Sequence, residues 1–291
     1  MTETIRADQF GDDEQNRVQY RKEGPVAILT LTDEALNGYT FKMFRDLDRC
    51  ILQARFDPEV QVILIVGDGE HFCAGANIKM LEAADAESKY YFCLHANETL
   101  LRLEHTPKLV IAAINGHCVG GGFEIALACD LRIARKGSGK IGLPEVNLGV
   151  LPGTGGTQRL TRLLGGAKAL QMMIDGTTFS TEEAESLGLI HMQLGDAVEE
   201  EKNGKIRKRP GLTRTQFLEA VIAKAQTYCA PDKAGMAVGH IKRAVQSGGE
   251  LPLEAGLVLE RELQAKLFSS ADADEGLGAF VEKRKARFNN R

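Results

Sequence analysis

Two short, continuously apolar runs constrain the fold of this chain more than any other feature. Residues 62–66 read Val-Ile-Leu-Ile-Val, and residues 109–114 read Leu-Val-Ile-Ala-Ala-Ile. Neither run alternates polar with apolar residues, and both are too short for buried helices. Strands that are covered on both faces have this pattern, which is typical of a parallel sheet between helices. The two runs therefore predict an α/β domain.

The residues around these runs supply the other expected elements. Residues 18–31 contain two short strand-like segments with Glu-Gly-Pro between them, which predicts a β-hairpin. Helices are expected at about 38–52 and 90–105, where apolar residues recur on one face. Further short elements complete the alternation: a helix at 125–129 and strands at 131–134 and 140–142. Strands that alternate with helices again favour an α/β fold.

The pattern changes near residue 197, and four parts are expected along the chain. These are a polar tail at 1–16, an α/β core at 17–196, a charged linker at 197–212 and a helical domain at 213–291. The linker carries an acidic run and then a basic run, with Gly and Pro as breakers. We expect a solvated connection there, and a docking site for an acidic partner is the alternative.

Composition indicates an ordinary globular protein of the cytoplasm. The 291 residues are 43% hydrophobic and carry a formal net charge of −4, which provides no general attraction for nucleic acid. No apolar run approaches the ~20 residues that span a bilayer, and the amino terminus lacks an apolar signal core. Six cysteines lie far apart with no CxxC pair, so we expect buried thiols and neither a metal site nor disulfides.

Each apolar run is followed by a glycine-bearing turn. HFCAGANI at residues 71–78 follows the first run, and NGHCVGGGFE at residues 115–124 follows the second. The carboxyl ends of parallel strands share one edge of a sheet, where ligands bind. Glycines allow close approach to the backbone, and two amide donors together can stabilise an enolate oxygen. The glycine patterns of phosphate and dinucleotide sites are absent after these strands.

Two glutamates are the candidates for proton transfer. Glu124 is separated from the glycine triplet by one residue, and Glu145 lies in the apolar sequence Gly-Leu-Pro-Glu-Val. Desolvation would raise the pKa of such a carboxyl above about 4.3, as an acid that works near neutral pH requires. The spacing leaves open a surface or capping role for each glutamate. A third glycine-rich loop, at residues 151–160, favours a structural turn.

Four segments resemble the enoyl-CoA hydratase/isomerase family. They are HFCAGANIKM at 71–80, NGHCVGGGFEIALACD at 115–130, PEVNLGVLPGTGGTQRL at 144–160 and AFVEKRKARF at 279–288. The similarity extends from about residue 18 to the last helix. It implies a crotonase-like spiral of ββα units followed by a C-terminal helical domain, which in this family builds trimers and usually hexamers.

The resemblance also implies a mechanism. The N–H groups of Ala76 and Gly121 match the family's oxyanion hole, and Glu124 and Glu145 match its paired catalytic glutamates. Glu124 would direct water at Cβ and Glu145 would deliver a proton at Cα, giving a 3-hydroxyacyl-CoA as in the β-oxidation of fatty acids. No cofactor is implied beyond the coenzyme A of the acyl-CoA substrate. Further substrate and coenzyme A contacts match Ala74, Asn77, Ile78, Gly149, Phe280 and Lys283, the last two often reaching in from a neighbouring subunit.

The sequence departs from the family at the nucleotide site. Asn77 stands where the family usually has Asp, and residues 33–37 lack a basic residue that often precedes the Asn. The alternatives to hydration are isomerisation, dehydration or carbon–carbon bond hydrolysis on the same enolate. A remoter alternative is an RNA-binding family member that uses the basic residues at 202–209, which the net charge disfavours.

The helix at about residues 80–101 is expected to border the acyl group. Four of its residues could form an aromatic pocket or a plain core stripe: Tyr90, Tyr91, Phe92 and His95.

Overall fold

The computed structural model describes residues 15–33, 36–202 and 205–290. Most of the polar tail expected at residues 1–16 therefore lies outside the described residues. Within the described residues, no helix is long and apolar enough to cross a membrane.

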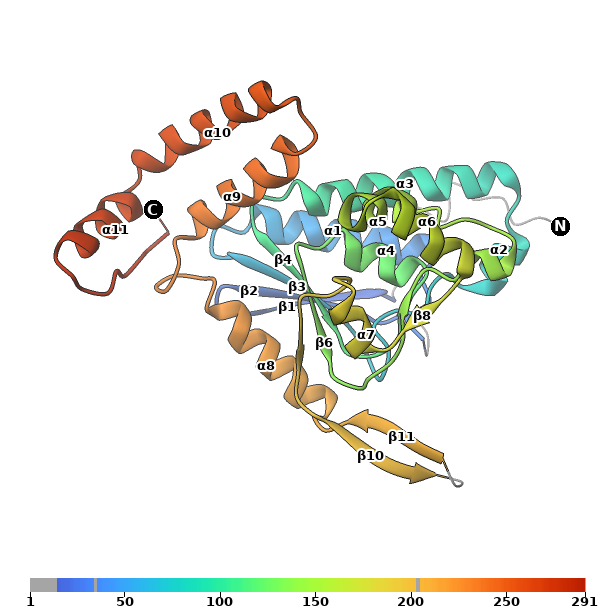
Figure 1. Cartoon of the computed structure of the whole chain (residues 1–291). Helices are drawn as coiled ribbons and strands as arrows, with labels where there is room; N and C mark the ends of the chain where they lie inside the picture. Colours follow the sequence, from blue (N-terminus) through green and yellow to red (C-terminus); the bar gives the residue numbers. More distant parts are fainter. Residues whose placement is uncertain (1–14, 34–35, 203–204, 291) are drawn as a thin grey trace.

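A six-stranded sheet forms the centre of the molecule, in the order β1-β2-β3-β4-β6-β9 (Figure 1). The hairpin of β1 and β2 is antiparallel, and the other neighbours in the sheet are parallel. The strands are β1 (Val18–Glu23), β2 (Val26–Leu31), β3 (Val62–Gly67), β4 (Leu109–Ile114), β6 (Leu131–Arg135) and β9 (Met192–Leu194). Every residue of β2 and β3 is buried, as the continuous apolar runs predict.

Two apolar cores cover the two faces of this sheet. Ile63 and Ile65 of β3 point into one core with the helices α1 (Phe41–Phe56) and α3 (Ala86–Glu104). Leu64 points into the other core. Successive side chains of a strand point to opposite faces, so one continuous apolar run serves both cores. The predicted α/β architecture is confirmed.

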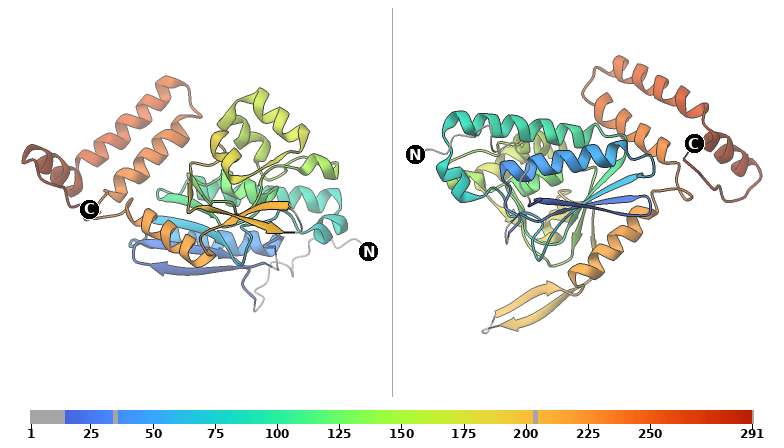
Figure 2. Two further views of the ribbon diagram at one scale, coloured as in Figure 1. Left: turned by 60° about the horizontal axis from the view of Figure 1, so that its bottom comes forward. Right: turned by 180° about the vertical axis from the view of Figure 1, so that it is seen from behind.

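Helix α8 (Arg214–Gln226) packs against the central sheet, whereas the sequence predicts it in a separate helical domain. Its residues Phe217 and Val221 are fully buried against the sheet, in the core that contains Leu64. The helical period showed an apolar face but not which element that face meets. Only the later helices extend away from the sheet (Figures 1 and 2): α9 (Gly235–Gly248), α10 (Leu253–Phe268) and α11 (Ala271–Val281).

The charged segment expected to be a solvated linker is a β-hairpin instead. Strand β10 (Ala197–Lys202) pairs antiparallel with β11 (Lys205–Pro210), and the hairpin projects from the body of the molecule (Figure 1). Glu199 lies opposite Lys208. Opposite charges on facing strands stabilise such a pair. The acidic run and the basic run are therefore the two sides of one hairpin.

Shorter elements surround the carboxyl ends of β3 and β4. A second sheet has the order β5-β7-β8, from strands β5 (Cys118–Val119), β7 (Ile141–Gly142) and β8 (Thr178–Phe179). The helices are α2 (Ile78–Ala83), α4 (Gly121–Leu127), α5 (Gly156–Leu164), α6 (Gly166–Asp175), α7 (Thr181–Ser186) and the 3-10 helix η2 (Glu145–Leu148). All six cysteines are free thiols, and all are buried except the half-buried Cys93.

A buried ion pair fastens α9 to the core. Lys242 Nζ lies 2.9 Å from a carboxylate oxygen of Asp130, and the two side chains are only 4% and 10% exposed. Lys242 Nζ also donates to the carbonyl oxygens of Leu103, at 3.2 Å, and Lys108, at 3.1 Å. One ammonium group thus joins the extended helices to the ends of α3 and β4.

Replacing Lys242 with Met is expected to lower the free energy of unfolding by about 3–5 kcal/mol, because Asp130 would stay buried without its partner. The neighbouring Arg243→Met variant removes the same charge from an exposed position of α9 and serves as the control. Urea denaturation measures both. Equal losses in the two variants would contradict a structural role for the buried pair.

Candidate functional site

The two glycine-bearing turns lie side by side. The N–H groups of Phe72 and Cys73 both donate to the carbonyl oxygen of His117, each at 3.1 Å, and Val119 N–H donates back to Cys73 O at 3.2 Å. A Cβ built on Gly75 would lie 3.3 Å from Val119 O, and Gly75 has a φ of +98°. Glycine suits both the close approach and this backbone conformation. The turns after β3 and β4 therefore meet, as the sequence predicts.

Two amide donors are available where these turns meet. Tyr39 N–H donates to Gly75 O and Asn77 N–H donates to Tyr39 O, so the N–H of Ala76 is left out of this pairing. Gly121 begins α4, where the first amides have no partner within the helix. No described residue accepts a hydrogen bond from the N–H of Ala76 or Gly121. Two such donors can hold one carbonyl oxygen.

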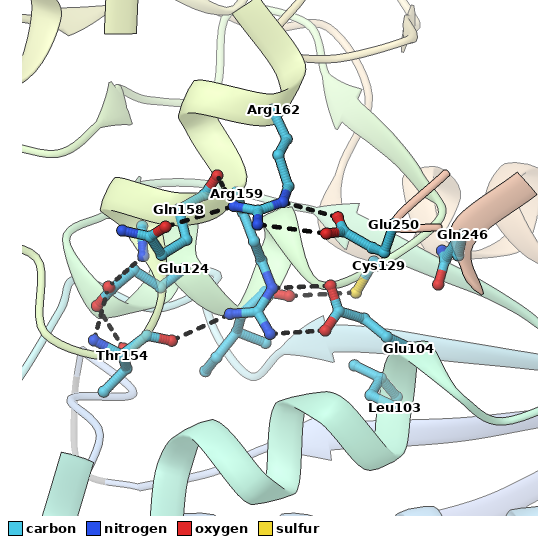
Figure 3. Close-up of polar contacts among 12 residues, drawn as sticks. Leu103, Glu104, Glu124, Cys129, Thr154, Gln158, Arg159, Arg162, Gln246 and Glu250 are labelled. Atoms are coloured by element: carbon cyan, nitrogen blue, oxygen red, sulfur yellow. Dashed lines mark hydrogen bonds and ion pairs between the residues drawn. The ribbon is translucent and has the colours of Figure 1, made fainter. Parts of the chain in front are cut away.

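Glu124 lies in the first turn of α4 and is fully buried. Its Oε1 accepts from Thr154 N–H at 2.8 Å and from Gly156 N–H at 2.7 Å, and its Oε2 accepts from the Thr154 hydroxyl (Figure 3). The glycine-rich loop that the sequence suggested as a structural turn thus supplies three donors to one carboxyl. These donors fix the orientation of Glu124.

A second set of contacts holds that loop in place. Arg159 donates to Thr154 O at 3.2 Å and makes a bidentate pair with Glu104 of α3, at 2.8 and 2.6 Å. Arg162, one turn further along α5, pairs with Glu250 at 2.7 Å and links α5 to the segment between α9 and α10 (Figure 3). Planar, bidentate arginine pairs impose geometry as well as attraction.

Glu145 has different surroundings from Glu124. A Cβ built on Gly120 would lie 3.2 Å from Glu145 Oε1, so this carboxyl also lies at the glycine turn. Its Oε2 is buried and has no hydrogen-bond partner among the described residues. Burial, and then the nearby charge of Glu124, raise the pKa of Glu145 from 4.5 to about 7. The predicted desolvation is therefore present at Glu145.

Tyr39 belongs to the site but was not found from the sequence. A Cβ built on Gly121 would lie 1.5 Å from Tyr39 Cε1, so the tyrosine ring occupies that space. Burial raises the pKa of Tyr39 well above its ordinary value, and the charge of Glu124 adds to this. The ring stacks on Phe92 with centroids 5.4 Å apart. The isolated Gly-Tyr-Thr sequence carries no signal of this contact.

The other expected binding residues fall into two groups. Ala74, Asn77 and Ile78 lie in the first turn with Ala76, and Asn77 caps α2 by accepting from Met80 N–H at 3.2 Å. Gly149 ends η2, the helix that begins with Glu145.

Phe280 and Lys283 are not brought to this site within the chain. Phe280 is in α11 and 85% exposed, and Lys283 follows the end of that helix, far from the turns (Figure 1). Of the four residues expected to form an aromatic pocket or core stripe, Tyr90 and Tyr91 are exposed, and Phe92 is buried. His95 packs against Phe41, with ring centroids 5.0 Å apart.

The raised pKa of Glu145 should make the folding stability of the protein depend on pH. Between pH 4.5 and about 7 the folded protein binds a proton that the unfolded chain releases, so stability falls as pH rises through this window. Glu145→Gln cannot lose that proton. We compare the Tm of this variant with the Tm of the unmodified protein at the same pH. We expect this difference, variant minus unmodified protein, to be larger at pH 8 than at pH 5. A Tm difference that is the same at both pH values would contradict the buried acid.

Comparison with known proteins identifies the family of this chain. The sequence pattern of the enoyl-CoA hydratase/isomerase family matches residues 21–291. A short-chain-enoyl-CoA hydratase of Clostridium acetobutylicum is 34% identical, over 96% of this chain and 100% of that protein.

Solved structures give the same result. The enoyl-CoA hydratase of Geobacillus kaustophilus superposes with a TM-score of 0.85 and 38% identity, covering 96% of this chain and 98% of that one. The enoyl-CoA hydratase of Bacillus anthracis gives a TM-score of 0.82 and 30% identity, covering 95% and 100%. The expected crotonase fold is confirmed. The chain is an enzyme of the enoyl-CoA hydratase/isomerase family.

Proposed function

We propose that this enzyme adds water syn across the double bond of a 2-enoyl-CoA to give a 3-hydroxyacyl-CoA. The observation that carries the proposal is the pair of glutamates, Glu124 and Glu145, in unlike surroundings beside two available amide donors. The names of the relatives, which are hydratases, support the same reaction. Isomerisation, dehydration and carbon–carbon hydrolysis would use the same oxygen site, but two carboxyls favour water chemistry.

The amide donors would act on the thioester carbonyl. Its oxygen would accept hydrogen bonds from the N–H groups of Ala76 and Gly121. When water attacks Cβ, the electron pair of the double bond moves toward the carbonyl, and negative charge develops on that oxygen. Fixed donors stabilise this charge without reorganising, and losing one donor typically costs about 100–1000-fold in rate.

The two glutamates would divide the proton transfers. Glu124, held at both oxygens, would orient the water and take its proton as the oxygen bonds to Cβ. Glu145, whose pKa of about 7 keeps a large fraction of the carboxyl protonated near neutral pH, would give a proton to Cα as the enolate collapses. The two transfers add one water to the substrate. Groups of this kind contribute about 100–10,000-fold each.

The reaction would need no cofactor apart from the coenzyme A of the substrate, and we place it in the cytoplasm. We propose further that Phe280 and Lys283 contact coenzyme A bound to a neighbouring subunit of a trimer or hexamer. Leu277 and Val281 support this assembly, because they are exposed apolar residues on the same helix.

Loss of either glutamate is expected to stop hydration. We predict that Glu124→Gln and Glu145→Gln each lower kcat for crotonyl-CoA by at least about 100-fold, because each removes one proton transfer and keeps the side-chain size. Loss of the conjugated-thioester absorbance follows the reaction. Glu219→Gln, on the exposed face of α8, is the control. An unmodified enzyme that is inert on crotonyl-CoA and on longer or cyclic enoyl-CoAs would refute the hydratase assignment.

A further inference from the structure

A cavity of about 240 Å³ lies between α2 and α3, beside the proposed oxyanion donors. Asn77 lines it, and Asn77 directly follows Ala76 in the turn. An acyl chain whose carbonyl oxygen is held by Ala76 N–H therefore has this cavity next to it. Phe41, Met80 and Phe92 give it apolar walls.

Two cations also line this cavity, and no aspartate or glutamate of the described chain does. Lys79 is exposed, whereas Lys89, from the first turns of α3, is half-buried. The Lys89 ammonium lies over the Phe92 ring, 4.9 Å from its centroid. Cation–π contact holds an ammonium in place but does not neutralise it. The cavity therefore has a fixed positive charge in a wall that otherwise combines apolar side chains with Thr40, Asn77, Lys79 and Ser88.

Lys89 also lies within electrostatic reach of the proposed chemistry. Its charge opposes, in part, the burial that raises the pKa of Glu145. None of the ion pairs among the described residues includes Lys89, and its side-chain hydrogen-bond partner is the Cys93 thiol. A half-buried ammonium attracts an anion that binds beside it, and it gains no such attraction from a methyl group.

We propose that the cavity takes an acyl group whose far end carries a carboxylate, and that Lys89 pairs with that carboxylate. This inference rests on the proposed hydratase function and specifies its substrate class. Dicarboxylic enoyl-CoA esters belong to this class. The corresponding simple fatty enoyl-CoA esters would bring no carboxylate to ion-pair distance of the Lys89 ammonium.

The test compares two substrates with the same number of acyl carbons. Glutaconyl-CoA ends in a carboxylate at C5, and 2-pentenoyl-CoA ends in a methyl group there. In Lys89→Met we expect the ratio of kcat/KM for glutaconyl-CoA to kcat/KM for 2-pentenoyl-CoA to fall by about 10–100-fold, because a hydrogen bond to a charged group is lost with the first substrate only. A change that acts through the pKa of Glu145 affects both substrates and cancels in this ratio. Lys79→Met removes the same charge at the exposed position and should affect the two substrates equally.

The outcomes separate this inference from the proposed function. Equal losses on both substrates in Lys89→Met, or no loss on either, would overturn the role of Lys89. An enzyme that hydrates 2-pentenoyl-CoA but not glutaconyl-CoA would overturn the substrate class while the hydratase function stands. Inactivity on both of these and on crotonyl-CoA would instead refute the hydratase function.

Discussion

The site depends on the burial of one carboxyl group. Glu124 has no exposed surface, and a buried polar group is costly unless it is hydrogen-bonded. Thr154 and Gly156 supply the donors, and the pair of Arg159 with Glu104 anchors the loop that carries them. The same contacts fix the start of α4. The position of the Gly121 amide beside the first turn follows from that arrangement.

The two glutamates have different surroundings, and this difference decides which one suits the role of acid and which one that of base. Glu124 accepts three hydrogen bonds, whereas the Oε2 atom of Glu145 is buried without a partner among the described residues. Burial disfavours the charged form of Glu145, and the nearby negative charge of Glu124 disfavours it further. Together they raise the pKa of Glu145 to about 7. When surroundings separate two carboxyls in this way, one suits the role of acid and the other that of base.

Local patterns predict the sheet, the glycine turns and the candidate glutamates. Strand burial and turn conformation depend on residues that are close together in the sequence, so a short segment is enough to indicate them. Contacts between distant residues were missed. Thr154 and Glu124 are separated by 30 positions, and Arg159 and Glu104 by 55. Tyr39 was missed for the same reason. The sequence predicts a linker at residues 197–212 and not a hairpin, because the opposite charges of the two strands stabilise them only once the strands are paired.

The most direct measurement of the central claim is the pH dependence of kcat/KM for hydration of crotonyl-CoA, which reports the ionisation of the free enzyme. If Glu145 must be protonated to deliver its proton, kcat/KM falls about tenfold for each pH unit above its pKa of about 7. A kcat/KM that stays constant, or rises, between pH 7 and pH 9 would contradict the assignment of Glu145 as the acid.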